Sequence, residues 1–216
     1  MTRHALSHFA MATALAALAG AAHADLSVFT SQATFNAAAR LPGTDTFAAV
    51  PLDFVGSPAS RSAGPYAYTV SASGGLYGVG SAADVWLSTN LSGDTLTFSG
   101  FGGNVGGIGG FFFGSDITGS FLAGQSLTVT AVDSLGTTAV QTLSNASPAS
   151  FLGFISSGSM VSLSVSPLNR DAYATVNNLT LAAIPEPEIY ALLLAGLGAV
   201  AFVVRRRDAG MPPRMA

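Results

Sequence analysis

Apolar side chains alternate with serine and threonine through the middle of the chain. In Ser126–Asp133 the apolar positions Leu127, Val129 and Ala131 share one face of a strand. Similar stretches recur about every 8–12 residues, with turn-forming residues between them. This spacing predicts an all-β domain over residues 25–183, an antiparallel β-sandwich or jelly roll. The strands that the pattern predicts are Leu52–Val55, Tyr66–Ser71, Asp84–Ser88, Asp94–Ser99, Asn104–Phe113, Ser126–Asp133, Thr138–Leu143, Ser150–Ser156, Met160–Ser166 and Tyr173–Leu181.

Two stretches of this domain depart from the alternation. Gln32–Ala39 is rich in alanine and follows Thr30 and Ser31, either of which could cap a helix. We therefore expect one short N-terminal helix there, with Phe35 facing inward. Leu41–Pro65 is interrupted by prolines and predicts loops around the first strand.

The first 24 residues have the pattern of a secretory signal peptide. A positively charged start precedes the apolar run Phe9–Ala22. Ala22 and Ala24 place small side chains three and one residues before Asp25, the expected first residue of the mature chain. Residues 1–24 therefore predict export through the secretion machinery and removal by signal peptidase.

A second apolar run lies near the C-terminus, at residues 189–204. As a helix it would be roughly 24 Å long, slightly shorter than a hydrocarbon core of about 30 Å, and it predicts a single transmembrane helix. Arg205, Arg206 and Arg207 follow directly and are expected to stop the segment at the cytoplasmic side. The predicted topology is N-out and C-in, with residues 208–216 as a cytoplasmic tail.

The tail also carries a family resemblance. Pro185, Glu186 and Pro187, followed by the apolar Tyr190–Gly198 and the three arginines, resemble the PEP-CTERM sorting signal of Gram-negative bacteria that make exopolysaccharide. The resemblance implies that residues 184–207 are read by exosortase, a membrane-embedded processing enzyme, with the Pro-Glu-Pro triplet as its recognition motif. It further implies transient anchoring in the inner membrane, followed by a location at the cell surface or outside the cell.

Composition excludes several kinds of chemistry. Cysteine and lysine are absent, and the three histidines, His4, His8 and His23, would leave with the signal peptide. Residues 25–184 contain no glutamate either, so catalysis by Ser–His–Asp, Cys–His or Ser–Lys groups and the usual zinc sites are excluded. Eight aspartates and three arginines leave this stretch with five net negative charges, which disfavours nucleic-acid binding.

Aspartates are the remaining candidates for chemistry. A glycosidase needs two carboxyl groups roughly 5–10 Å apart. Calcium takes oxygen ligands, and Asp84, Asn90 and Asp94 lie near one another in sequence. The alternative interpretation is that these side chains bond to the backbone of turns. The aspartates considered for a catalytic pair are Asp45, Asp53, Asp84, Asp94, Asp116 and Asp133.

Four aromatic residues could stack on sugar rings: Tyr66, Tyr68, Tyr77 and Trp86. The alternative is that Trp86 and a tyrosine belong to the core. Gly100–Gly114, with eight glycines and four phenylalanines, predicts a buried strand that packs closely on its neighbour, or alternatively a self-associating edge.

Together these patterns predict an exported, non-catalytic protein of the envelope or extracellular matrix that is associated with exopolysaccharide. A carbohydrate-binding module is the alternative, and a glycosidase with an aspartate pair is the third hypothesis. We expect no cofactor, with calcium as the one metal that the side chains would suit.

Overall fold

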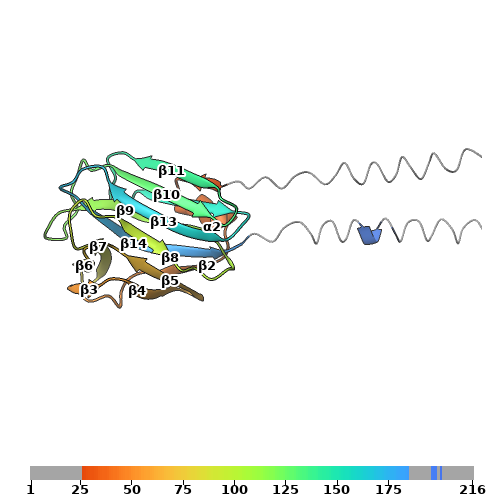
Figure 1. Cartoon of the computed structure of the whole chain (residues 1–216), viewed down its shortest axis with the longest axis horizontal. Coiled ribbons are helices and arrows are strands. Elements are labelled where there is room, and N and C mark those ends of the chain that lie inside the picture. The colour runs from red at the N-terminus through yellow and green to blue at the C-terminus, as the bar shows by residue number, and fades with distance from the viewer. Residues whose placement is uncertain (1–25, 185–195, 199, 201–216) are drawn as a thin grey trace, which may run out of the picture.

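The computed structural model describes residues 26–184, 196–198 and 200. Within these residues the chain forms two antiparallel sheets that pack face to face (Figure 1). A single large hydrophobic cluster with residues from both sheets lies between them. The predicted all-β class is confirmed.

One sheet has eight strands and the other has six. In order across the first sheet lie β1 (Leu26–Phe29), β12 (Phe151–Ser156), β9 (Val105–Ser115), β14 (Tyr173–Ala183), β7 (Asp84–Thr89), β6 (Leu76–Ser81) and β3 (Phe54–Gly56), while β2 (Arg40–Asp45) pairs with β14. In order across the second lie β11 (Thr138–Leu143), β10 (Leu127–Asp133), β13 (Met160–Pro167), β8 (Leu96–Ser99), β5 (Tyr66–Ser71) and β4 (Ala59–Ala63).

From β7 onwards the connections are those of a jelly roll. The chain changes sheet at every connection except the β10–β11 hairpin, which gives the orders β12-β9-β14-β7 and β11-β10-β13-β8. The earlier strands widen this framework: β1 beside β12, β6 and β3 beyond β7, and β5 and β4 beyond β8. The strands predicted from Tyr66 onwards coincide with β5 and β7 to β14 within about two residues at each end.

The targeting segments lie mostly outside the described residues. This applies to the predicted signal peptide, 1–24, to the tail 208–216 and to most of 189–204, of which residues 196–198 and 200 are described and helical. In the described part of the chain, no helix is long and apolar enough to cross a membrane. The signal peptide and the transmembrane helix therefore stay predictions.

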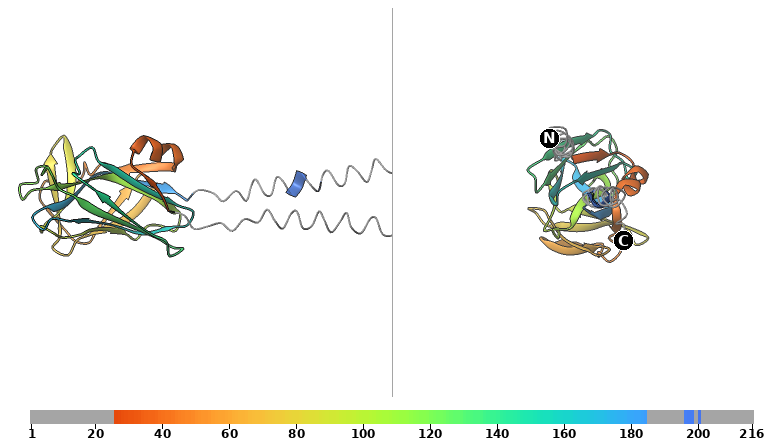
Figure 2. Two further views of the ribbon diagram at one scale, coloured as in Figure 1. Left: turned by 90° about the horizontal axis from the view of Figure 1, so that it is seen from above. Right: turned by 90° about the vertical axis from the view of Figure 1, so that its right-hand side faces the viewer.

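The glycine-rich strand β9 is buried on both faces. Helix α2 (Gln32–Ala38) lies on the outside of the sandwich (Figure 2) and packs its fully buried Phe35 against Phe151, with ring centroids 5.6 Å apart. A Cβ at Gly153, on the neighbouring β12, would lie 2.6 Å from the Phe35 ring, so glycine makes room for it. The inward Phe35 is confirmed. The self-associating edge is wrong, because β9 lies between β12 and β14.

The one strand predicted within Leu41–Pro65, Leu52–Val55, overlaps β3. The loops predicted around it are wrong, because β2 and β4 also form in this stretch. Pro42 is compatible with β2 because that strand pairs only with β14 and leaves one side without a ladder. Strand β6 was also missed. Its glycine at 78 breaks the alternation, and a Cβ there would collide with the carbonyl of Pro51.

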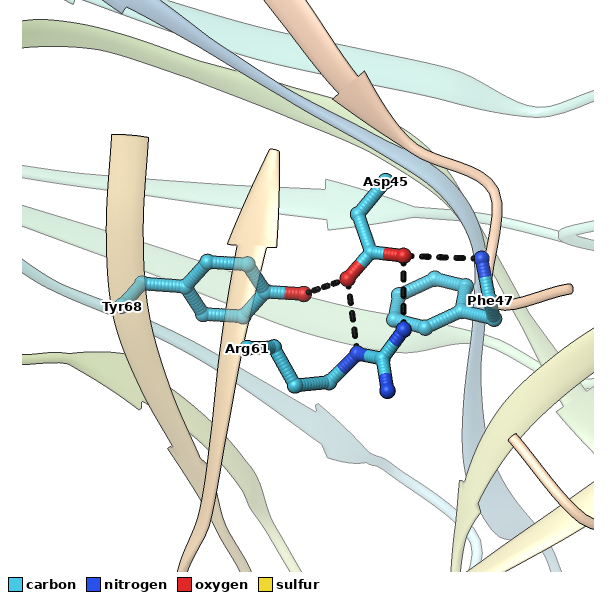
Figure 3. Close-up of polar contacts among 4 residues, drawn as sticks. All are labelled: Asp45, Phe47, Arg61 and Tyr68. Atoms are coloured by element: carbon cyan, nitrogen blue, oxygen red, sulfur yellow. Dashed lines mark hydrogen bonds and ion pairs between the residues drawn. The ribbon is translucent and has the colours of Figure 1, made fainter. Parts of the chain in front are cut away.

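A buried carboxylate joins β2 to the opposite sheet (Figure 3). Asp45 accepts two hydrogen bonds from the guanidinium of Arg61 on β4, at 2.7 and 2.8 Å. It accepts two more, from the hydroxyl of Tyr68 at 2.7 Å and from the backbone N–H of Phe47 at 2.9 Å. The guanidinium also lies over the ring of Phe47, 5.2 Å from its centroid. Both carboxylate oxygens of Asp45 therefore accept two hydrogen bonds each.

The environment of the cluster raises the pKa of both Arg61 and Tyr68. Burial alone would lower the pKa of Arg61, but the hydrogen bonds and charge of Asp45 raise it above its usual range. Burial, and then the neighbouring carboxylate, raises the pKa of Tyr68 well above its usual range. Arg61 therefore stays charged, and Tyr68 keeps its proton, at physiological pH.

Removing Arg61 tests the cost of leaving this carboxylate alone. Arg61→Met should lower the free energy of unfolding by about 3 kcal/mol, because an uncompensated buried charge is strongly destabilising. Urea unfolding of the 25–184 segment measures it. Arg170→Met is the control, since Arg170 is exposed and its replacement should change stability by less than about 0.5 kcal/mol. Equal urea midpoints for the two variants would contradict the role of Arg61.

Candidate functional site

A pocket of about 460 Å³ opens on the outer face of the eight-stranded sheet. Its side walls include Tyr77 of β6 and Tyr173 of β14, and residues 88–90 at the end of β7 lie between them. The turn 116–119 after β9 forms its rim. Its volume is within the range of small-molecule sites, roughly 300–1,000 Å³.

Strand pairing explains why the two tyrosines share this face. Tyr77 and Thr175 are both paired with Ser88, from opposite sides of β7. Paired residues of antiparallel strands project to the same face, and so do residues two apart on one strand. Tyr173, two residues before Thr175, therefore projects to the face of Tyr77. The sequence cannot reveal this because the two tyrosines are far apart along the chain.

The hydroxyl of Tyr77 donates to Asp53 at 3.1 Å. This hydrogen bond, with the charge of Asp53, raises the pKa of Tyr77. The side chain is therefore neutral and oriented. No described residue hydrogen-bonds to the hydroxyl of Tyr173, which is half-buried.

Asp116 places a fixed carboxylate at the rim. Its Oδ1 accepts hydrogen bonds from the hydroxyl and the backbone N–H of Thr118, at 2.6 and 2.8 Å, and from the backbone N–H of Ser120 at 3.0 Å. These bonds, the one from the Thr118 hydroxyl first, lower the pKa of Asp116. No described residue bonds to its Oδ2, so the ionised carboxylate can accept a ligand hydroxyl. It is the one carboxylate among the described residues that line the pocket.

The four residues predicted to stack on sugar rings lie in different environments. Tyr66 and Tyr68 are wrong for this role, because they project inward from β5 and keep only 5% and 2% of their surface exposed. Trp86 is half-buried and lies outside the pocket lining. Its ring is perpendicular to that of Phe113, with the ring centroids 4.9 Å apart, and its indole N–H donates to Asp84 at 2.9 Å. Tyr77 alone of the four lines the pocket.

The structure does not bring the predicted calcium ligands together. Asp84 and Asn90 flank β7, so their backbones are separated by six residues of extended chain, roughly 20 Å. Asn90 and Asp94 do meet, because both bond to the backbone of Gly74 in a turn. The shared calcium site is therefore wrong, and the turn interpretation holds for this pair. The described residues contain no cluster of three or more acidic or histidine side chains suited to a metal.

Asp116 and Asp133 are also apart. Asp116 follows the end of β9, whose Ser115 pairs with the first residue of β14. Asp133 ends β10 at the other end of the sandwich, where it accepts hydrogen bonds from Ser156 and from the turn amides of residues 135 and 137.

The described fold reaches the sorting triplet without a linker. Strand β14 ends at Ala183, and the backbone N–H of Ile184 donates to the carbonyl of Asn104 at 2.9 Å. A Cβ at Gly106 would lie 2.6 Å from the Cα of Ile184, so this glycine permits the contact. The predicted residues of sorting and cleavage lie outside the described residues: Pro185, Glu186, Pro187, Arg205, Arg206, Arg207, Ala22, Ala24 and Asp25.

Comparison with known proteins bears on this C-terminal stretch. A search of curated proteins gives no match. Residues 183–207 match the family model of the PEP-CTERM protein-sorting motif, which begins at the last residue of β14. The C-terminal part of the chain therefore carries a PEP-CTERM protein-sorting motif.

Proposed function

We propose that this chain is a non-catalytic protein of the envelope or extracellular matrix, sorted by an exosortase-type enzyme and associated with exopolysaccharide. The observation that carries the proposal is the sorting motif at residues 183–207, which follows directly from the last strand of a jelly-roll domain. Such a motif implies export and membrane-anchored transit before release. The triple Arg205–Arg207 supports an N-out and C-in orientation during that transit.

Two observations support a non-catalytic role. Residues 25–184 contain none of the histidine, cysteine, lysine or glutamate side chains used by most hydrolases. Among the described residues that line the pocket, Asp116 is the one carboxylate, whereas glycoside hydrolysis commonly uses two. We therefore propose that the domain binds or packs without catalysing a reaction.

The pocket favours carbohydrate binding as a second candidate function. Tyr77 and Tyr173 offer aromatic surface, and the Oδ2 of Asp116 offers an acceptor for sugar hydroxyls. Because the carboxylate stays ionised and the domain is acidic, the pocket favours neutral over anionic sugars.

Replacing the glutamate of the motif tests the sorting proposal. We expect Glu186→Ala to leave the protein membrane-bound and unprocessed in the native host, because the processing enzyme loses the carboxylate of the Pro-Glu-Pro triplet. Membrane fractionation and the mass of the product measure this. Glu188→Ala is a matched control, two residues along, and should be processed like the parent chain. Normal release of the Glu186→Ala protein would refute the proposal.

Replacing a pocket tyrosine tests sugar binding. A glycan array of bacterial exopolysaccharide fragments, probed with the 25–184 segment, identifies a ligand for calorimetry. Tyr173→Ala should then weaken binding by roughly 30-fold, the loss of about 2 kcal/mol typical of a central aromatic contact. Trp86→Phe, on the same face but outside the pocket, should bind as the parent does. Absence of any glycan ligand, or equal affinity after Tyr173→Ala, would exclude this function.

A further inference from the structure

One end of the sandwich gathers both ends of the described domain. Leu26, the first residue of β1, pairs with Ser156, and the neighbouring Ile155 pairs with Gly107 of β9. Gly107 in turn pairs with Ala182, close to the end of β14. Figures 1 and 2 show that the start of the described domain, in red, and its end, in blue, lie on the same side of the sandwich. This side is called the exit end below.

Two exposed leucines flank the exit point of the chain. Leu41, 71% exposed, follows Arg40, which pairs with Ala183. Leu135, 55% exposed, occupies the turn after β10. Hydrogen bonds connect this turn to the exit point: the Ser134 N–H donates to the carbonyl of Ser159, and the Ser159 hydroxyl donates to the carbonyl of Gly103, both at 2.8 Å. Asn104, the next residue, holds Ile184.

Among the described residues, most exposed acidic side chains lie away from this end. Asp94, Asp116 and Asp171 lie at the opposite end, where β14 begins. Asp53 and Asp84 belong to the side of the sheet formed by β3, β6 and β7. Asp133 does lie at the exit end, but it is 2% exposed and bonded to Ser156.

The length of chain beyond the domain limits its distance from a membrane. Four residues separate Ile184 from the apolar run 189–204. Even fully extended, the five steps from Ile184 to residue 189 span at most about 18 Å. A headgroup layer occupies roughly 5–8 Å of that span on each side of the bilayer. The exit end must therefore lie within roughly 10–13 Å of the lipid surface whenever the apolar run is inserted.

We propose that Leu41 and Leu135 form a contact surface for lipid, through which the exit end rests on the bilayer. The two leucines enter the interface between the lipid headgroups and the acyl chains. This inference rests on the membrane-anchored step of the proposed function. The inserted segment tethers the domain to the bilayer and so raises the effective concentration of the leucines at the lipid surface. The contact can therefore form even if it is too weak to hold an untethered domain on the membrane. Cleavage of the tail removes the tether, so the same weak contact allows release.

The absence of cysteine permits a direct test. Leu41→Cys, Leu135→Cys and Ile117→Cys variants are each labelled with an environment-sensitive fluorophore. The chain, purified from membranes, is reconstituted into vesicles of phosphatidylcholine and phosphatidylglycerol that contain spin-labelled lipid. Ile117 is the matched control, an aliphatic residue that is 84% exposed at the opposite end. We expect quenching at least threefold stronger at positions 41 and 135 than at 117.

Equal quenching at all three positions would overturn the lipid contact. Flotation of the vesicles separates this failure from a failure of the proposed function: a chain that floats without preferential quenching refutes only the contact. A chain that does not float refutes the membrane-anchored step as well. Quenching that is weak in vesicles, with a blue shift that appears only when an exosortase is added, would assign the surface to a protein and overturn the proposal.

Discussion

The carboxylate of Asp45 is the constraint on which the two-sheet arrangement depends. A charge buried between sheets needs partners, and they come from the opposite sheet: Arg61 of β4 and Tyr68 of β5. Asp45 belongs to β2, which also pairs with the last residues of β14. The ion pair therefore fixes the strand edge beside which the chain leaves the domain for its sorting motif.

Much of the framework was predictable from the sequence because most strands alternate strictly. In β10 every second side chain is buried, which is the pattern that Leu127, Val129 and Ala131 display. The missed strands obey other constraints. Strand β2 has a glycine and an aspartate at its buried positions, 43 and 45, where alternation expects large apolar residues. The inward position of Asp45 is explained only by Arg61, which lies opposite it.

The pocket, too, depends on contacts between strands that the sequence alone does not show. The sequence marks Tyr77 as a candidate for stacking on sugars, but it does not assign Tyr173 and Asp116 to a site with it. Their proximity follows from the register of β6, β7 and β14. Tyr68 shows the converse: its type suits sugar stacking, but its strand turns it toward the buried carboxylate. The C-terminal motif needed no structure, because order and spacing along the chain define it.

The central claim is that an ordered jelly roll extends to the first residue before the sorting triplet. Amide hydrogen exchange of Ile184 in the membrane-purified chain tests it most directly, because this N–H donates to the carbonyl of Asn104. The account predicts protection comparable to that of Leu181 within β14. Exchange of Ile184 at the rate of an unstructured peptide, with Leu181 protected, would contradict it.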